Sequence, residues 1–307
     1  MISTDTSANV IQETNVPQER DGADVRAPRA ASLVILSGYL AMSGVLLGTD
    51  GHTTLAALHA AGVMIAAWTL VDQRKAARAI GDLLPLLVAP ILYAEIPLLI
   101  AALGSSFHDD IVQEWETALF GVQASKVLAT NVPNAAVSEV LHLGYLGYYP
   151  LIFVPPLLLY ARRERRGYAE TVAALTFVYM TCWVIFAVAP VEGPRYLWSA
   201  EAPDGPIRRL TLALLAAGSS RGAAFPSSHM AVSTAQAVMA LRWQPRVGVV
   251  AMVVAILVGI GAVYGGFHYG VDVVTGAALG LVIGVTTIVL GKPRHDGKDA
   301  SGAYGEA

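Results

Sequence analysis

Long apolar segments constrain the fold of this 307-residue chain more than any other feature. A helix needs about 20 mainly apolar residues to cross the hydrocarbon core of a bilayer. Segments that approach or exceed this length are 31–48, 53–71, 83–104, 137–160, 168–190, 225–242, 247–267 and 270–291. The sequence therefore predicts an all-α fold, a polytopic membrane helix bundle with about eight transmembrane helices. The first two segments could instead form one re-entrant hairpin, but their length and the intervening Gly51 favour two spans.

Composition supports a membrane protein and excludes several other classes. Only 14% of the residues are charged, whereas soluble domains carry about 25%. A net charge of −3 offers no basic excess for nucleic acid, so the expected partner is the lipid bilayer. Cys182 is the single cysteine, which excludes an intrachain disulfide framework and a zinc site built from cysteines.

The two ends of the chain are polar. Residues 1–28 lack the basic start and apolar core of a signal peptide, and we expect them to form a disordered cytoplasmic tail. Residues 292–307 are rich in glycine and charge, and we expect a second cytoplasmic tail there.

Lysine and arginine predict the orientation of the bundle. With the N-terminus inside, 15 of the 20 basic residues fall on the cytoplasmic side, which agrees with the positive-inside rule. Four of the other five, Arg195, Arg208, Arg209 and Arg221, fall in the outer loop 191–224. The expected location is the plasma (inner) membrane, and the basic outer loop predicts a bound anion on that face.

Two sequence blocks at the outer ends of apolar segments carry the candidate chemistry. The first runs from Phe225 to His229 and opens the sixth segment. Pro226 suits the first turn of a helix, where no N–H is needed. The N–H groups of Ser227, Ser228 and His229 would then be free to bind an anion, and the two serine hydroxyls add donors. The plainer alternative is an ordinary helix cap followed by a buried histidine.

The second block places His268 four residues before Asp272. On a helix the two side chains share a face. A carboxylate bonded to one ring nitrogen fixes the tautomer of a histidine and raises the nucleophilicity of the other nitrogen. A structural His–Asp pair that caps the last helix is the alternative. With His229, the block supplies two imidazoles, one to attack a phosphate and one to protonate the leaving group.

Other polar residues of the outer segments complete the set of candidates. Arg195 follows the fifth segment, and a guanidinium can bind phosphate oxygens through two hydrogen bonds. Arg221 is a second phosphate-binding candidate, although either arginine could instead anchor the chain at the interface. His142 is more typical of a satisfied helix histidine. Residues 107–120 predict an amphipathic interfacial helix, which could be a cap over the bundle or a gate for lipid entry.

These blocks resemble the PAP2 superfamily, the type 2 phosphatidic acid phosphatases. The family signature reads Lys-x6-Arg-Pro, then Pro-Ser-Gly-His, then Ser-Arg-x5-His-x3-Asp. The matching positions of the second and third parts are Pro226, Ser227, His229, His268 and Asp272. Ser228 takes the glycine position, and Gly261 and Ala262 take the Ser-Arg positions.

The first part of the signature is degenerate. Val188 stands in place of the lysine, and Tyr196 follows the arginine in place of proline. The stretch from Pro190 to Arg195 instead resembles the branch that contains the inositol phosphorylceramide synthases, the Aur1-like group. The stretches 110–121 and 142–150 are also similar to that branch.

The resemblance implies the roles of the candidate residues. His268 would be the nucleophile that forms a phosphohistidine, and Asp272 would orient it. His229 would protonate the leaving alcohol and then activate the acceptor. Arg195, Ser227 and the nearby N–H groups would hold the phosphoryl oxygens, with no metal and no cofactor required.

The resemblance also implies an organisation and a substrate class. Residues 81–291 would form a six-helix catalytic core, and residues 29–80 would add two transmembrane helices. The substrate would be a membrane lipid phosphate bound at the extracytoplasmic face. Water as acceptor would make the protein a phosphatase, whereas a lipid or polyol hydroxyl would make it a phosphotransferase.

Two other classes compete with this interpretation. An intramembrane histidine and aspartate could carry protons in a small-molecule transporter, although the charged groups lie at one membrane edge and no inverted repeat is evident. The side chains of His229, His268 and Asp272 could instead ligate zinc, although the nearby arginines would repel a cation. Flux into proteoliposomes without hydrolysis would favour the transporter, and sensitivity of turnover to a chelator would favour zinc.

Overall fold

The computed structural model describes residues 18–72, 74–198 and 201–291, and these residues form helices and no strand. The helices are α1 (Gln18–Thr49), α2 (Thr53–Val71), α3 (Lys75–Ile91), η1 (Leu92–Glu95), α4 (Ile96–Leu103), α5 (Asp109–Phe120), α6 (Ala124–Asn131), α7 (Ala135–Leu146), α8 (Tyr148–Ala161), α9 (Arg165–Val188), α10 (Pro194–Leu197), α11 (Pro206–Gly218), α12 (Ser228–Trp243), α13 (Pro245–Tyr264) and α14 (Gly270–Leu290).

The predicted class, an all-α polytopic membrane bundle, is confirmed. Within the described residues, six helical segments are long and apolar enough to cross a membrane: α1, α2, the continuous α3–η1–α4 segment, α9, α13 and α14. The pair α7 and α8 makes a seventh if it is one span bent by 42°. The remaining predicted segment is α12, a helix of 16 residues that packs against α8, α9, α13 and α14.

The first helix begins earlier than the sequence analysis predicted. Residues 18–28 belong to α1, so the expected disordered tail does not extend to them. Arg29 gives a physical reason, because its guanidinium contacts Asp82 of α3 at 2.8 Å and the carbonyl oxygen of Thr69 in α2 at 3.0 Å. Residues 1–17 and the predicted tail 292–307 lie outside the described residues.

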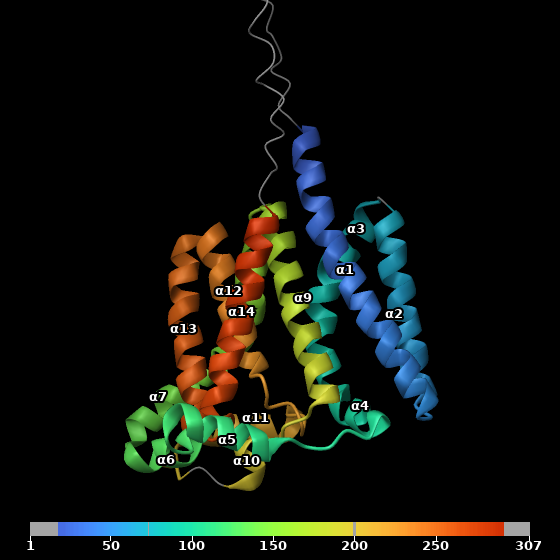
Figure 1. The fold of residues 1–307 in the computed structure, drawn as a ribbon. Helices are drawn as coiled ribbons and strands as arrows, with labels where there is room; N and C mark the ends of the chain where they lie inside the picture. Colours follow the sequence, from blue (N-terminus) through green and yellow to red (C-terminus); the bar gives the residue numbers. More distant parts are fainter. Residues whose placement is uncertain (1–17, 73, 199–200, 292–307) are drawn as a thin grey trace, which may run out of the picture.

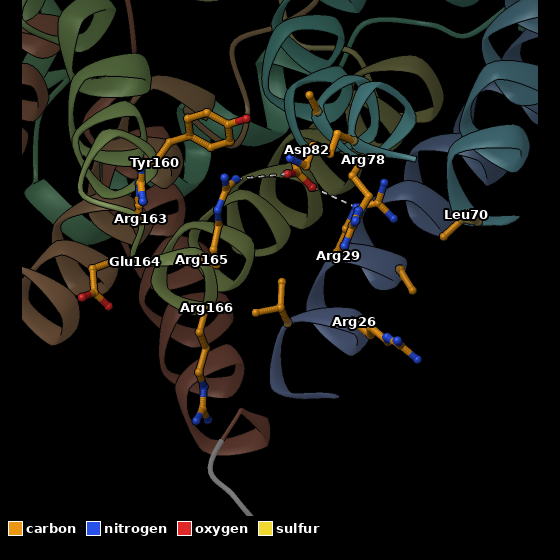
Figure 2. Close-up of a pocket in the computed structure, with 14 residues that line it drawn as sticks. Arg26, Arg29, Leu70, Arg78, Asp82, Tyr160, Arg163, Glu164, Arg165 and Arg166 are labelled. Atoms are coloured by element: carbon orange, nitrogen blue, oxygen red, sulfur yellow. Dashed lines mark hydrogen bonds and ion pairs between the residues drawn. The ribbon is translucent and has the colours of Figure 1, made fainter. Parts of the chain in front are cut away.

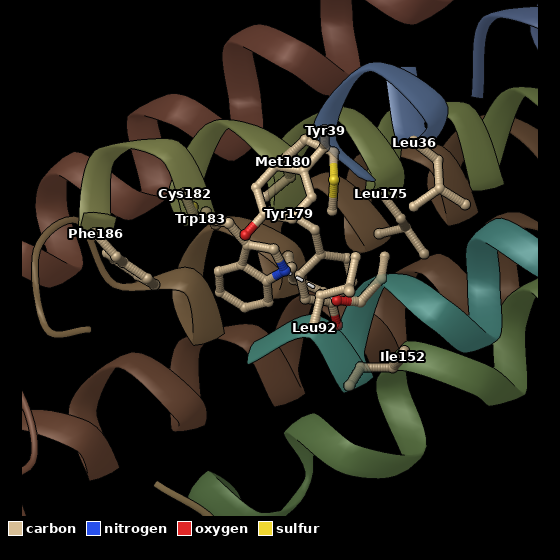
Figure 3. Close-up of a cluster of buried hydrophobic side chains, with 14 of the residues drawn as sticks. Leu36, Tyr39, Leu92, Ile152, Leu175, Tyr179, Met180, Cys182, Trp183 and Phe186 are labelled. Carbon is tan, nitrogen blue, oxygen red and sulfur yellow. Dashed lines mark hydrogen bonds between the residues drawn. The ribbon is translucent and has the colours of Figure 1, made fainter. Parts of the chain in front are cut away.

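The long helices stand side by side, and the short ones gather at one end of the bundle (Figure 1). Helices α1 to α3 form one flank, α12 to α14 form the other, and α9 runs between them. Aromatic side chains fill the centre, where Trp183 of α9 donates from its indole nitrogen to the carbonyl oxygen of Ala89 at 2.9 Å and packs beside Tyr179 (Figure 3). The short helices α5, α6, α7, α10 and α11 close the end that carries both histidine blocks.

A seam of small residues joins α12 to α14. Gly276, Gly280 and Gly284 recur every four residues on α14 and face the backbone and small side chains of α12. A methyl group at Gly280 would meet the carbonyl oxygen of Ala231. Small residues let membrane helices approach closely and pack well. The seam therefore holds the start of α12, where His229 lies, close to the start of α14, which His268 immediately precedes.

Candidate active site

The loop between α13 and α14 presents His268. Its Nδ1 atom lies 3.0 Å from the carbonyl oxygen of Ala224 and 3.4 Å from Asp272 Oδ2. A carbonyl oxygen can only accept, so Nδ1 carries the proton and Nε2 of the neutral ring keeps its lone pair. Asp272 also accepts from the backbone N–H of Tyr269 at 2.8 Å, which caps α14. The predicted His–Asp pair therefore exists, and the carbonyl oxygen of Ala224 is the closer partner of the histidine.

His229 lies in the first turn of α12. Its ring stacks on Tyr145, contacts Tyr148, and lies 5.8 Å from the ring of His268 between centroids. The two imidazoles, which come from blocks far apart in the sequence, are therefore neighbours in the fold.

The start of α12 differs from the prediction in one detail. Pro226 precedes the helix cap instead of occupying the first turn, because Ser227 is the N-cap and its hydroxyl accepts from the N–H of Met230 at 3.3 Å. The N–H of Ser227 is used as well, and it donates to the carbonyl oxygen of Asp272 at 3.0 Å. This bond ties the two histidine blocks together. The N–H groups of Ser228 and His229 have no acceptor among the described residues.

Arg195 reaches the histidines from the short helix α10. The loop before it is held by Val191, whose N–H and carbonyl bond the backbone of Gly222 and Ala224 at 3.1 and 3.0 Å. Gly193 has a φ of 90° and lies too close to Ala224 for a side chain. Arg195 donates to the hydroxyl of Ser219 at 2.8 Å.

A small cavity brings the predicted groups together. Arg195, His229 and His268 all border it, and its volume is about 30 Å³, which is enough for a few water molecules at most. Glu192 and Ser219 also line it. The cavity is too small for a phosphoryl group while Arg195 donates to Ser219.

The other predicted phosphate ligands lie apart from this cavity. The Ser227 hydroxyl serves as the cap of α12, and Ser228 borders a different, larger cavity. Arg221 is exposed and forms an ion pair with Glu192. Its guanidinium also lies over the ring of Phe107, 5.3 Å from the centroid. His142 is a buried helix histidine, with Nδ1 2.6 Å from the carbonyl oxygen of Ser138.

The larger cavity was not predicted from the sequence. Its volume is about 470 Å³, and His229, Tyr93, Leu215 and Ser219 border both cavities. Its other lining side chains are mainly aromatic and aliphatic: Pro90, Tyr148, Tyr149, Ile152, Phe153, Tyr179, Trp183 and Leu214. His229 thus stands between a small cavity that charged side chains also line and a large apolar one. The tyrosines within 142–150 are the one sequence feature that could have indicated this cavity, because Tyr148 and Tyr149 line it.

Two carboxylates of α5 also escaped the sequence analysis. Asp109 accepts from the N–H groups of Glu192 and Gly193 at 2.8 and 2.9 Å. It also accepts from the Tyr269 hydroxyl at 3.0 Å. Burial and the neighbouring Asp109 carboxylate raise the pKa of Tyr269, so the phenol stays protonated and donates.

Glu116 of α5 supports the start of α14, which lies far away in the sequence. It is fully buried and accepts from the N–H groups of Gly270 and Val271 at 2.9 and 2.7 Å. Ile111 and Trp115, on the same helix, are exposed. The amphipathic helix predicted at 107–120 therefore directs the two carboxylates, together with the buried Val112, toward the candidate site.

The fold and this site define a class before any comparison is made. The chain is a multi-pass membrane protein with two histidines, a carboxylate and an arginine at one end of the bundle. No three His, Cys, Asp or Glu side chains in the described part of the chain converge in an arrangement that could hold a metal ion.

Comparison with known families agrees with the resemblance seen in the sequence. A family model described as the PAP2 superfamily matches residues 111–286, more than half of the chain. The chain belongs to the PAP2 superfamily, a group of phosphatases and phosphotransferases. Searches of curated proteins and of solved structures found no match.

Proposed function

We propose that this protein transfers the phosphoryl group of a membrane lipid phosphate through a phosphohistidine on His268. The observation that carries the proposal is the meeting of two imidazoles, from α12 and from the loop before α14, at one cavity that Arg195 also borders. In the first step, the lone pair of His268 Nε2 forms a bond to phosphorus and the bond to the lipid oxygen breaks. The leaving oxygen takes a proton from His229.

The second step regenerates the enzyme. An acceptor hydroxyl gives its proton to His229 and attacks phosphorus, and the bond between phosphorus and His268 breaks. Arg195 and the free N–H groups of Ser228 and His229 would stabilise the charge on the phosphoryl oxygens. The position of His229 supports this division of roles, because the large apolar cavity beside it can seat the lipid part of the leaving alcohol.

The sidedness of the reaction is part of the proposal. The positive-inside rule places the histidine end of the bundle outside and both termini in the cytoplasm. Arginines at the opposite end of α1, α3 and α9 agree with this orientation. The enzyme would then act on the outer leaflet of the plasma membrane.

A second candidate is Aur1-like transfer to a lipid or polyol hydroxyl. It is motivated by the stretch from Pro190 to Arg195, and the cavity of about 470 Å³ has room for an apolar acceptor beside His229. In the described residues Arg195 is the one arginine or lysine that borders the small cavity. The three-part signature of the superfamily contains more basic residues than this.

One experiment separates these outcomes. The purified full-length protein is incubated with ³²P-labelled lipid phosphates, with and without an alcohol acceptor, and with EDTA. We expect an acid-labile, base-stable phosphoenzyme that is absent from His268→Ala, and turnover that persists in EDTA. Free phosphate as sole product supports the phosphatase, and a labelled phosphate ester of the added alcohol supports the transferase. Turnover without label on His268 would exclude the mechanism.

A further inference from the structure

A second cavity lies at the end of the bundle opposite to the histidines. It has a volume of about 1030 Å³ and opens among α1, α2, α3, α9 and the turn before α9 (Figure 2). Its basic lining residues are Arg26, Arg29, Lys75, Arg78, Arg163, Arg165 and Arg166. Its acidic lining residues are Asp82 and Glu164. Arg166 also pairs with Glu170 at 2.9 Å, so four positive charges remain in excess in one cavity.

The two carboxylates do not neutralise this cavity. Asp82 lies 2.8 Å from Arg29 and 3.6 Å from Arg165, so one carboxylate serves two guanidinium groups. Among the described residues, Arg26, Lys75, Arg78 and Arg163 have no carboxylate within ion-pair distance. Arg29 and Arg78 both line the cavity (Figure 2), where like charges repel. A cluster of this kind is stabilised when an anion enters it.

The backbone adds to the positive potential. The long helices α3 and α9 both begin at this cavity, at Lys75 and Arg165. The free N–H groups and the dipole of a helix N-terminus attract anions. Arg163, between α8 and α9, holds a left-handed backbone with φ of 62°, which is uncommon for a residue with a side chain.

The positive-inside rule alone does not explain this arrangement. That rule needs basic residues on one side of the membrane and is satisfied when they are spread around the rim. Arg242 and Arg246 are an example of basic residues that satisfy the rule from the rim, because they lie at the turn between α12 and α13 and outside the cavity. The seven other residues come from separate segments of the chain and converge on one space.

We propose that this cavity binds the phosphate-bearing headgroup of an anionic membrane lipid. The helices that form it pass the test for membrane spans, so their ends lie at the level of lipid headgroups. Apolar side chains such as Val25, Leu70 and Ala79 also line the cavity and can contact the glycerol and the upper acyl chain. The bound lipid would join α1 and α3 to α9 through charge, at a distance from the histidine site.

The test measures lipid binding and does not depend on the reaction. Full-length protein in detergent is mixed with phosphatidylcholine or with phosphatidylglycerol, and retained lipid is counted by native mass spectrometry. We expect retention of phosphatidylglycerol over phosphatidylcholine. The variant Arg78→Gln/Arg163→Gln should bind phosphatidylglycerol at least tenfold more weakly, since each basic residue near a lipid surface contributes about a fivefold change. The matched control Arg242→Gln/Arg246→Gln should bind as the wild type does.

Three results would overturn the proposal. The first is equal loss in both double variants, which would indicate a general surface charge effect. The second is unchanged binding in Arg78→Gln/Arg163→Gln. The third is binding of soluble pyrophosphate without retention of anionic lipid, which would assign the cavity to a free polyanion. Arg78→Gln/Arg163→Gln could unfold at a lower temperature than the wild type in phosphatidylcholine. In that case Arg26→Gln/Lys75→Gln, which removes two other unpaired charges, must show the same loss of lipid binding.

Discussion

Two pairs of a buried histidine and a carboxylate occur among the described residues, and their difference shows what makes such a pair available for chemistry. His268 pairs with Asp272 beside α14, and His59 of α2 lies 2.8 Å from Glu95 of η1. Both histidines are 4% exposed, so burial does not distinguish them. Ser43 lies 3.0 Å from the other ring nitrogen of His59, whereas His268 keeps an unprotonated nitrogen and borders the cavity of Arg195.

The two pairs differ at the ring nitrogen that does not face the carboxylate, and this difference separates a structural pair from a pair that can react. A ring held at both nitrogens ties helices together, and here His59 joins α1, α2 and η1. A ring held at Nδ1 alone keeps a lone pair for an incoming electrophile. The comparison predicts that the two pairs respond to mutation in opposite ways, in activity for one and in stability for the other.

The largest expected effect on activity belongs to His268→Ala. Under the proposed mechanism His268 is the nucleophile, so its removal should lower kcat by at least about 10⁴-fold, as for catalytic nucleophiles of known enzymes, while the thermal unfolding temperature changes little. Single-turnover assays with labelled lipid phosphate measure the loss. Activity near that of the wild type would show that the His268–Asp272 pair is not catalytic.

Asp272→Asn should lower kcat less than the same change does in an enzyme whose aspartate is the single partner of its histidine. Such a loss costs about 10⁴-fold in the Ser-His-Asp proteases. Here the carbonyl oxygen of Ala224 is closer to Nδ1 than the carboxylate is, so we expect a loss of about 10²- to 10³-fold in kcat. Steady-state kinetics measure it, and a loss as large as that of His268→Ala would show that the carbonyl does not hold the ring.

Arg195→Lys should lower kcat/KM by about tenfold. A lysine keeps the charge but cannot make two parallel hydrogen bonds to phosphate oxygens, and one charge-assisted bond is worth about 1.5–3 kcal/mol. The matched control is Arg209→Lys, which changes an exposed arginine that pairs with Asp204. Equal effects of the two substitutions on kcat/KM would argue against a phosphate contact at Arg195.

His59→Ala should have the smallest effect on activity, within about twofold for the folded protein. It leaves Glu95 without its partner between α1 and α2, and breaking a buried pair costs about 3–5 kcal/mol. We therefore expect a clear fall in the thermal unfolding temperature, measured in the same detergent as the wild type. A loss of activity with no loss of stability would reverse the roles assigned to the two pairs.

The bundle and the two histidine blocks could be predicted from the sequence because both depend on local properties. The length and apolarity of a segment indicate a span, and α12 was included although it is only 16 residues long. His268 and Asp272 lie four residues apart, so their pairing follows from helix geometry. The pairing of His59 with Glu95 could not be predicted from sequence spacing, because the two residues lie on separate helices.

The sequence by itself determined the class of fold, the two imidazoles and the arginine-rich loop 191–224, because composition and short spacings carry that information. Only the tertiary structure decided that Arg195 and not Arg221 borders the cavity with His229 and His268. It also decided that the carboxylates of α5 hold the loop of Arg195 and the start of α14. The physical reason is that these contacts join segments far apart in the chain, and their positions depend on how closely the helices pack.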